Sequence, residues 1–277
     1  MRLIYITNTR LPSEKANSYQ SIQMCNSFTK EFDSVEMWVP KAHNTEKLSK
    51  VEDIYKYYNV EESFYIKKFF QFDSKFLKFI NEFLWANTKG IIFALNIIIN
   101  LLKFRNDRDI VIFTRDWYVL LLFTKLKKTG LFQNKIFYES HKFSSFLLKT
   151  IIAADGLIVI NKHLYSLHLN QGVKNIFLAH DGVNIDEYKG MTKYVFNEKK
   201  EDYTIVYTGS LFKWKGVYTL VDSMKYVLSG IKLIIIGGSG DYLIELNEYI
   251  KKNELKNIEI IPHIPKKETL SYLQKSD

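Results

Sequence analysis

Short apolar runs alternate with stretches of helical periodicity along most of this 277-residue chain. Apolar runs of strand length occur at 2–6, 35–39, 109–114, 135–139, 156–160 and 175–178, and helical patterns occur at 17–32, 117–128, 143–153 and 162–171. Alternation of this kind is typical of βαβ units. It therefore predicts an α/β fold with a parallel sheet.

A second alternation follows a polar stretch at 189–202, which we interpret as a linker. It predicts strands at 204–207, 232–236 and 258–261 and helices at 216–228, 242–252 and 266–275. We expect two domains, 1–185 and 186–277, each an open parallel sheet covered by helices. Ligands bind such sheets at the carboxyl ends of their strands, so the loops at those ends are the candidate sites.

The charge of the chain narrows the class of partner. Its 39 lysines and arginines outnumber 30 acidic residues, for a formal net charge of +9. A basic surface indicates nucleic acid, nucleotide phosphates or membrane lipid as a partner. No nucleic-acid-binding module is recognisable, so we do not expect nucleic acid. The single cysteine, Cys25, excludes an internal disulfide and favours a reducing compartment, which predicts a cytoplasmic protein.

Residues 64–105 combine lysines with many apolar and aromatic residues. The stretch Ile91–Leu102 is shorter than the ~20 apolar residues of a membrane span, and Asn96 and Asn100 interrupt it. It predicts either a buried helix or a helix lying on a membrane surface. We expect the region to face an anionic membrane or an acceptor; core helices with a solvated basic face are the alternative.

The turn at 209–216 carries Lys213 and Lys215 where the next helix is expected to begin. No acidic residue lies between Asp202 and Asp222. A helix N-terminus is already positive, so lysines there are unfavourable unless an anion binds in the turn. The order of residues differs from that of a P-loop, which argues against nucleotide hydrolysis. A pair of solvated surface lysines is the alternative.

The other loops argue against bound cofactors. At 237–240, Gly238 and Gly240 begin a weak dinucleotide-binding pattern whose third glycine is replaced by Leu243, so a tight turn is as good an interpretation as a ligand site. His141 and His180 follow predicted strands. HExxH, paired CxxC and Asp-rich patterns are missing, so neither zinc nor calcium is expected.

Several segments, in consistent order, resemble one family. They are RLPSEKANSYQSIQMCNSF, FTRDW, YESH, HDGVN, YTGSLFKWKGVYTLVDSM and IIGGSGDYLIEL. Together they resemble retaining glycosyltransferases of the GT-B architecture, specifically glycosyltransferase family 4. The resemblance implies an α/β fold of two Rossmann-like domains facing a cleft, the second incomplete.

The resemblance also implies roles for individual residues. Lys215, helped by Lys213, would contact the donor diphosphate in a loop that contains Gly209 and Ser210, where the family often has arginine after the glycine. His141, preceded by Glu139, would lie near the transferred sugar. The remaining implied positions are Gly238, Gly240 and Ile264 on the donor side, and Glu14, Lys15 and Asn17 in a loop near phosphate or acceptor.

The implied reaction transfers a sugar, with retention, from a nucleotide-diphosphate sugar to a lipid-linked or polysaccharide acceptor. It would serve cell-surface glycan synthesis at the inner face of a membrane and need no metal or other cofactor. The family's Glu-rich donor segment has no match before Asp277, so we expect a truncated donor site. A nucleotide-sugar epimerase of the same architecture and a non-catalytic membrane- or partner-binding module are the alternatives.

Overall fold

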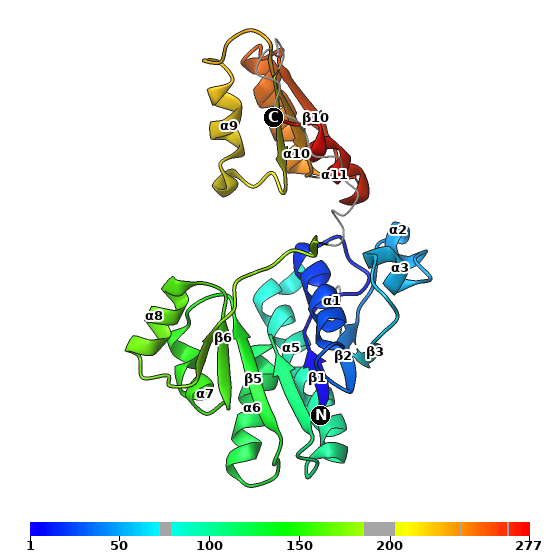
Figure 1. The fold of residues 1–277 in the computed structure, drawn as a ribbon, viewed down its shortest axis with the longest axis vertical. Coiled ribbons are helices and arrows are strands. Elements are labelled where there is room, and N and C mark those ends of the chain that lie inside the picture. Colours follow the sequence, from blue (N-terminus) through cyan, green and yellow to red (C-terminus); the bar gives the residue numbers. More distant parts are fainter. Residues whose placement is uncertain (73–78, 186–202, 239, 265) are drawn as a thin grey trace. The chain divides into compact units, whose positions relative to one another are not determined.

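The structure is a computed structural model that describes the whole chain except residues 73–78, 186–202, 239 and 265. The chain divides into unit 1, Met1–Asn184, and unit 2, Ile185–Asp277 (Figure 1). Each unit has its own sheet and its own hydrophobic core. The predicted α/β class with parallel sheets is confirmed.

Unit 1 is built on a seven-stranded parallel sheet with the order β3-β2-β1-β4-β5-β6-β7. The strands are β1 (Arg2–Ile6), β2 (Ser34–Lys41), β3 (Tyr65–Phe70), β4 (Ile110–Thr114), β5 (Lys135–Ser140), β6 (Gly156–Val159) and β7 (Ile176–Leu178). The direction of strand addition reverses between β1 and β4. This reversal is the topological switch point of the sheet.

Helices cover both faces of this sheet. They are α1 (Ala16–Phe28), α2 (Glu46–Ser49), α3 (Ile54–Tyr58), α5 (Glu82–Leu101), α6 (Trp117–Lys128), α7 (Leu148–Ile152) and α8 (Lys162–Asn170), with 3₁₀ turns at Leu102–Phe104 and Ser145–Leu147. Side chains of β1 alternate between two cores: Leu3 and Tyr5 pack with α1 and α3, whereas Ile4 and Ile6 pack with α5 and α6. The sheet is therefore buried on both sides, as its apolar strands require.

Strand β3 was not expected from the sequence, which predicted a helix at Ile91–Leu102 and offered only core helices as the alternative for the region 64–105. Its residues pair with β2 from Glu36 opposite Tyr65 to Lys41 opposite Phe70. Because β3 is the edge strand, Tyr65 and Phe70 remain exposed and the strand lacks a continuous apolar run. Pairing with β2, a non-local contact, makes this segment a strand.

Unit 2 contains a three-stranded parallel sheet of order β10-β9-β8. Its elements are β8 (Tyr203–Thr208), a 3₁₀ turn η4 (Lys213–Lys215), α9 (Val217–Ser223), β9 (Ile231–Ile236), α10 (Asp241–Lys252), β10 (Ile258–Ile261) and α11 (Lys266–Gln274). Its core joins α9 and α10 to one face of the sheet through buried residues such as Val221, Leu233 and Leu246. On the β8 edge, the backbone N–H of Asp277 donates to the Thr204 carbonyl at 3.0 Å.

Candidate functional site

The first candidate site lies at the switch point of unit 1. The chain leaves β1 toward α1 on one face and leaves β4 toward α6 on the other. The Ile6 carbonyl accepts hydrogen bonds from the backbone N–H of Arg115 at 3.2 Å and from the Thr114 hydroxyl at 3.1 Å. These bonds hold the ends of β1 and β4 together while their loops diverge. Divergence of this kind opens a crevice for ligands in α/β sheets.

Three ionisable side chains converge there. Glu139 Oε1 lies 2.5 Å from His141 Nε2 and 3.6 Å from Arg115 Nε. Arg115 Nη2 lies 2.7 Å from the same His141 nitrogen. The Glu139 residue is only 4% exposed, and its Oε2 has no hydrogen-bond partner among the described residues. The predicted pair Glu139 and His141 is thus brought together, and Arg115 from the neighbouring strand end joins it.

A single imidazole nitrogen cannot serve both neighbours at once. With a hydrogen on Nε2, His141 donates to Glu139; without one, Nε2 accepts from Arg115. A buried carboxylate needs donors, which favours the hydrogen on Nε2 and donation to Glu139. The ring is partly exposed, so Nδ1 is then the nitrogen that a ligand can meet.

The network extends to α1 and to the segment after β7. Arg115 Nη1 donates to Gln20 Oε1 at 3.1 Å, and Gln20 Nε2 donates to Asp181 Oδ1 at 2.5 Å. His180, also predicted at a strand end, is instead held by its Nδ1 against the Ile160 carbonyl at 2.9 Å. Polar side chains thereby link the carboxyl ends of β4 and β5, the helix after β1 and the segment after β7.

The loop residues Glu14, Lys15 and Asn17 make different contacts. Glu14 pairs with Arg10 at 2.8 Å, and Lys15 donates its backbone N–H to Ser13 Oγ at 3.2 Å. Asn17 Oδ1 accepts from the Ser18 hydroxyl at 3.5 Å. The structure therefore places these residues around the start of α1 without joining them to the Arg115 network.

Buried Asp116 positions the Arg115 loop. Its Oδ1 accepts from the backbone N–H of Val119 at 2.9 Å and so caps α6. Burial raises the pKa of Asp116 to about 6, against the opposing effect of hydrogen bonds from Val119, Tyr118 and Asn8. The helix cap holds the end of β4 in place next to the site.

The second candidate site lies in unit 2, where two glycine turns pack against each other. Gly209 has φ of 153° and Gly237 has φ of 135°, and a Cβ on Gly237 would lie 2.0 Å from the Gly209 carbonyl oxygen. The backbone N–H of Gly209 donates to the backbone carbonyl of Ile236 at 3.0 Å. A Cβ on Gly238 would lie 2.3 Å from Leu211 Cδ1. Backbone packing requires glycine at 237, and the positive φ of 75° favours glycine at 238, which supports the tight-turn interpretation of 237–240.

The structure corrects the expected position of the two lysines. Lys213 and Lys215 lie in η4, and Gly216, with φ of 77°, separates them from α9. The argument from the positive end of the helix fails, because neither lysine is in the first turn of α9. Lys213 also has an acidic neighbour in space, since its Nζ lies 3.1 Å from Glu245 Oε2 of α10. The Glu245 carboxylate raises the pKa of Lys213.

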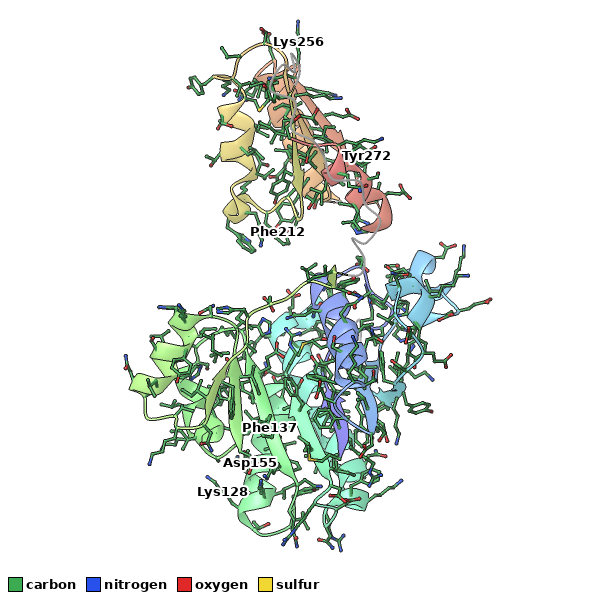
Figure 2. All side chains as sticks on the ribbon, in the orientation of Figure 1. Lys128, Phe137, Asp155, Phe212, Lys256 and Tyr272 are labelled. Carbon is green, nitrogen blue, oxygen red and sulfur yellow. The ribbon has the colours of Figure 1, made fainter. Side chains whose placement is uncertain are left out.

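Lys215 differs from Lys213 in its surroundings. Its Nζ lies 4.5 Å above the ring of Trp214, which stacks on Phe212 at 5.8 Å. In the described part of the chain, Lys215 makes no ion pair with a carboxylate. Figure 2 shows Phe212 of this turn at the end of unit 2 opposite Lys256. Lys215 is thus the lysine of this turn whose charge is open to an anion.

Three donor residues predicted from the sequence remain: Ser210, Gly240 and Ile264. The Ser210 carbonyl accepts from the Tyr207 hydroxyl at 2.8 Å. Gly240, with φ of 61°, is the N-cap residue of α10, and no atom lies within 4 Å of its Cβ position. Ile264 is half-buried after β10.

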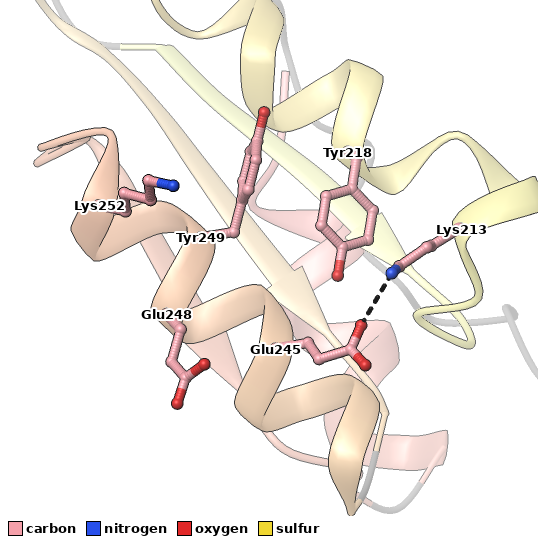
Figure 3. Close-up of a pocket in the computed structure, with 6 residues that line it drawn as sticks. All are labelled: Lys213, Tyr218, Glu245, Glu248, Tyr249 and Lys252. Atoms are coloured by element: carbon pink, nitrogen blue, oxygen red, sulfur yellow. Dashed lines mark ion pairs between the residues drawn. The ribbon is translucent and has the colours of Figure 1, made fainter.

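A shallow pocket of about 280 Å³ lies beside this turn (Figure 3). Lys213 and Tyr218 line one side of it, and α10 supplies Glu245, Glu248, Tyr249 and Lys252. Two carboxylates in its wall make it a poor site for a diphosphate, and Lys213 is already paired there. The open Lys215 is therefore a better anion site than this pocket.

Sequence reasoning missed Arg115. The segment FTRDW was recognisable, but a role for its arginine depends on β4 lying beside β5, which only the sheet order shows. No group of three metal-binding side chains occurs among the residues that the structure describes.

Comparison with known proteins supports the fold. Residues 192–277 match the family model of glycosyl transferases group 1. No curated protein matches the chain. TarM resembles it with a TM-score of 0.69 and 10% identity, over 98% of this chain and 78% of that chain.

Two further structures show the same likeness. WaaB, a lipopolysaccharide outer core galactosyltransferase, gives a TM-score of 0.64 and 15% identity over 99% of this chain and 71% of that chain. Anabaena HepE, in complex with UDP, gives 0.62 and 11% over 95% of this chain and 70% of that chain. The expected fold class, similar to GT-B glycosyltransferases, is confirmed; identities this low show the fold alone.

Proposed function

We propose that this chain is a glycosyltransferase that takes a sugar from a nucleotide-diphosphate donor. The observation that carries the proposal is the exposed Lys215, which makes no ion pair with any residue that the structure describes, beside two tightly packed glycine turns in the part of the chain that matches glycosyl transferases group 1. The UDP-bound HepE structure, and a UDP complex of an S. aureus TarM variant, support a nucleoside diphosphate as the leaving group.

Lys215 fits the chemistry of such a transfer. The bond between the sugar C1 and the β-phosphate oxygen breaks, and a bond forms between C1 and the acceptor hydroxyl oxygen. The hydroxyl proton passes to the departing phosphate in a same-face attack that retains configuration. Negative charge grows on the β-phosphate as the bond breaks, so Lys215 would stabilise the transition state more than the bound donor. This reaction requires no metal.

In unit 1 we assign sugar or acceptor binding to the Glu139–His141–Arg115 network. Glu139 orients the imidazole, so that Nδ1 of His141 can accept a hydrogen bond from a sugar hydroxyl. The acceptor class we propose is a lipid-linked or polysaccharide glycan. WaaB is described as acting on lipopolysaccharide outer core, and the TarM variant structure holds α-GlcNAc-glycerol, which supports this class.

Titration calorimetry with UDP tests the donor assignment. Lys215→Ala should raise the Kd of the full chain at least about tenfold, because a charge-assisted contact contributes ~1.5–3 kcal/mol. Lys256→Ala is the matched control, since this exposed lysine lies at the other end of unit 2 (Figure 2). Unchanged affinity in Lys215→Ala, or wild-type protein that binds no UDP, would refute the assignment.

Product analysis tests the reaction itself. Incubation with UDP-sugars and glycan acceptors should release UDP. NMR of the product should show that the transferred sugar keeps the anomeric configuration of the donor. EDTA should leave the rate unchanged. His141→Asn should lower the rate, whereas His163→Asn, at an exposed position of α8, should not.

A further inference from the structure

Helix α5 has the composition of a membrane helix but cannot cross a membrane. Among the described residues, Glu82–Phe104 forms one helical stretch of 23 residues that is long and apolar enough to span a bilayer. One side of it is built into unit 1: Phe93, Ala94 and Ile97 are fully buried in the core. Gly90 packs so closely on α6 that a Cβ there would lie 2.2 Å from the Tyr118 ring. If α5 crossed a bilayer, these core contacts would be lost.

The opposite side of α5 is apolar and faces solvent. Four side chains at helical spacing are 45–63% exposed: Leu84, Ile91, Leu95 and Ile99. Near the start of the helix, Phe79, Ile80 and Phe83 are 91%, 60% and 79% exposed, although Phe83 is on the same helix side as Gly90 and Ala94. We call these seven residues the α5 face. Several large apolar side chains exposed along one helix indicate a binding site, because water contact with them is unfavourable.

The segment that carries the α5 face is basic. In the described part of 64–105 there are five cationic side chains, Lys67, Lys68, Lys89, Lys103 and Arg105, against a single carboxylate, Glu82. On the helix itself, Lys89 Nζ lies 4.3 Å over the Trp85 ring. A second copy of the chain docking through the same surface would bring two sets of like charges together. An anionic lipid surface instead attracts them while it takes up the apolar side chains.

We propose that the α5 face docks unit 1 on an anionic membrane. Helix α5 lies in the plane of the interface, with its buried side in the protein and its exposed side among lipid headgroups and acyl chains. Phe79 and Phe83 insert beside it. Attachment is peripheral, because the core contacts of α5 stay intact.

Vesicle flotation of the full chain tests this proposal. Wild-type protein should float with vesicles of phosphatidylcholine and phosphatidylglycerol, and high salt or pure phosphatidylcholine should weaken binding. Ile91→Asn/Leu95→Asn should lower the partition coefficient at least about tenfold, because two half-exposed apolar side chains no longer enter the membrane. Lys89→Glu/Lys103→Glu should weaken binding to anionic vesicles alone. Leu169→Asn, at a similarly exposed position of α8, is the matched control.

Several results would overturn the proposal. Wild-type protein that does not bind anionic vesicles, or α5-face variants that bind like Leu169→Asn, would do so. Resistance to alkaline carbonate extraction would indicate a spanning helix instead. A dimer in sedimentation that the α5-face variants dissociate, without vesicle binding, would assign the face to a second copy. If Ile91→Asn/Leu95→Asn does not fold by circular dichroism, Phe79→Ser/Phe83→Ser tests the same surface.

Discussion

Gly237→Ala should destabilise the two glycine turns of unit 2 by more than the backbone conformation of Gly237 alone would predict. Gly237 has φ of 135°, a region that essentially only glycine adopts. Its new Cβ would lie 2.0 Å from the Gly209 carbonyl oxygen, so the backbone of one turn must move. Such a movement would disturb the hydrogen bonds from Gly209 to Ile236 and from Gly237 to Ile261, both 3.0 Å.

The expected magnitude follows from these contacts. Backbone strain contributes ~1–3 kcal/mol, and each disturbed hydrogen bond contributes ~1 kcal/mol. We therefore expect Gly237→Ala to destabilise β8 and β9 by at least about 3 kcal/mol. Gly216→Ala is the matched control, because Gly216 has φ of 77° in the same unit but nothing within 4 Å of its Cβ position. Only ~1–2 kcal/mol of left-handed strain is expected there.

Amide hydrogen exchange of the full chain measures both variants in the same elements. Exchange of β8 and β9 amides should accelerate much more in Gly237→Ala than in Gly216→Ala, while β1 and β4 of unit 1 should be unaffected. Equal acceleration in the two variants would refute the reasoning, because it would show that the close approach of the two turns has no energetic weight. UDP affinity should fall in parallel in Gly237→Ala.

Three further predictions concern unit 1. Glu139→Gln should destabilise the protein by ~1–3 kcal/mol in urea unfolding and lower transfer activity, because Arg115 and His141 lose a charged hydrogen-bonding partner; unchanged stability and activity would contradict the network. Asp116 has a folded pKa of about 6, above its unfolded value, so its charged form destabilises the fold above pH 6. As pH falls from about 6 to about 4, this effect, at most ~3 kcal/mol, should disappear in wild type and be absent in Asp116→Asn; identical pH profiles would refute it. Burial lowers the pKa of His168, which packs 5.1 Å from the Phe143 ring, so unfolding should become easier as pH falls below about 6.5. His168→Leu should flatten that dependence, and a profile that stays as steep as in wild type would argue against it.

Local patterns predicted most elements of both units. The helix expected at 117–128 occurs as Trp117–Lys128, and the strand expected at 258–261 occurs as Ile258–Ile261. Periodicity and capping residues such as Asp116 act within a few positions of each other, so a sequence displays them directly. Strand β3 was missed because apolar and polar residues do not alternate along its sequence, YIKKFF. Pairing with β2 makes this segment a strand.

The candidate sites divide in the same way. The sequence determined that Glu139 and His141 follow one strand and that two glycine turns end others, because these relations are local. Only the tertiary structure decided that Arg115 joins the histidine, that Glu245 pairs with Lys213 and that α5 keeps one apolar side outside the core. Arg115 and His141 are 26 positions apart in the chain, and Lys213 and Glu245 are 32 apart. The exposure of α5 depends on which side of the helix meets the sheet. Strand order and helix packing set them, because they are free-energy minima of the whole chain rather than preferences of its segments.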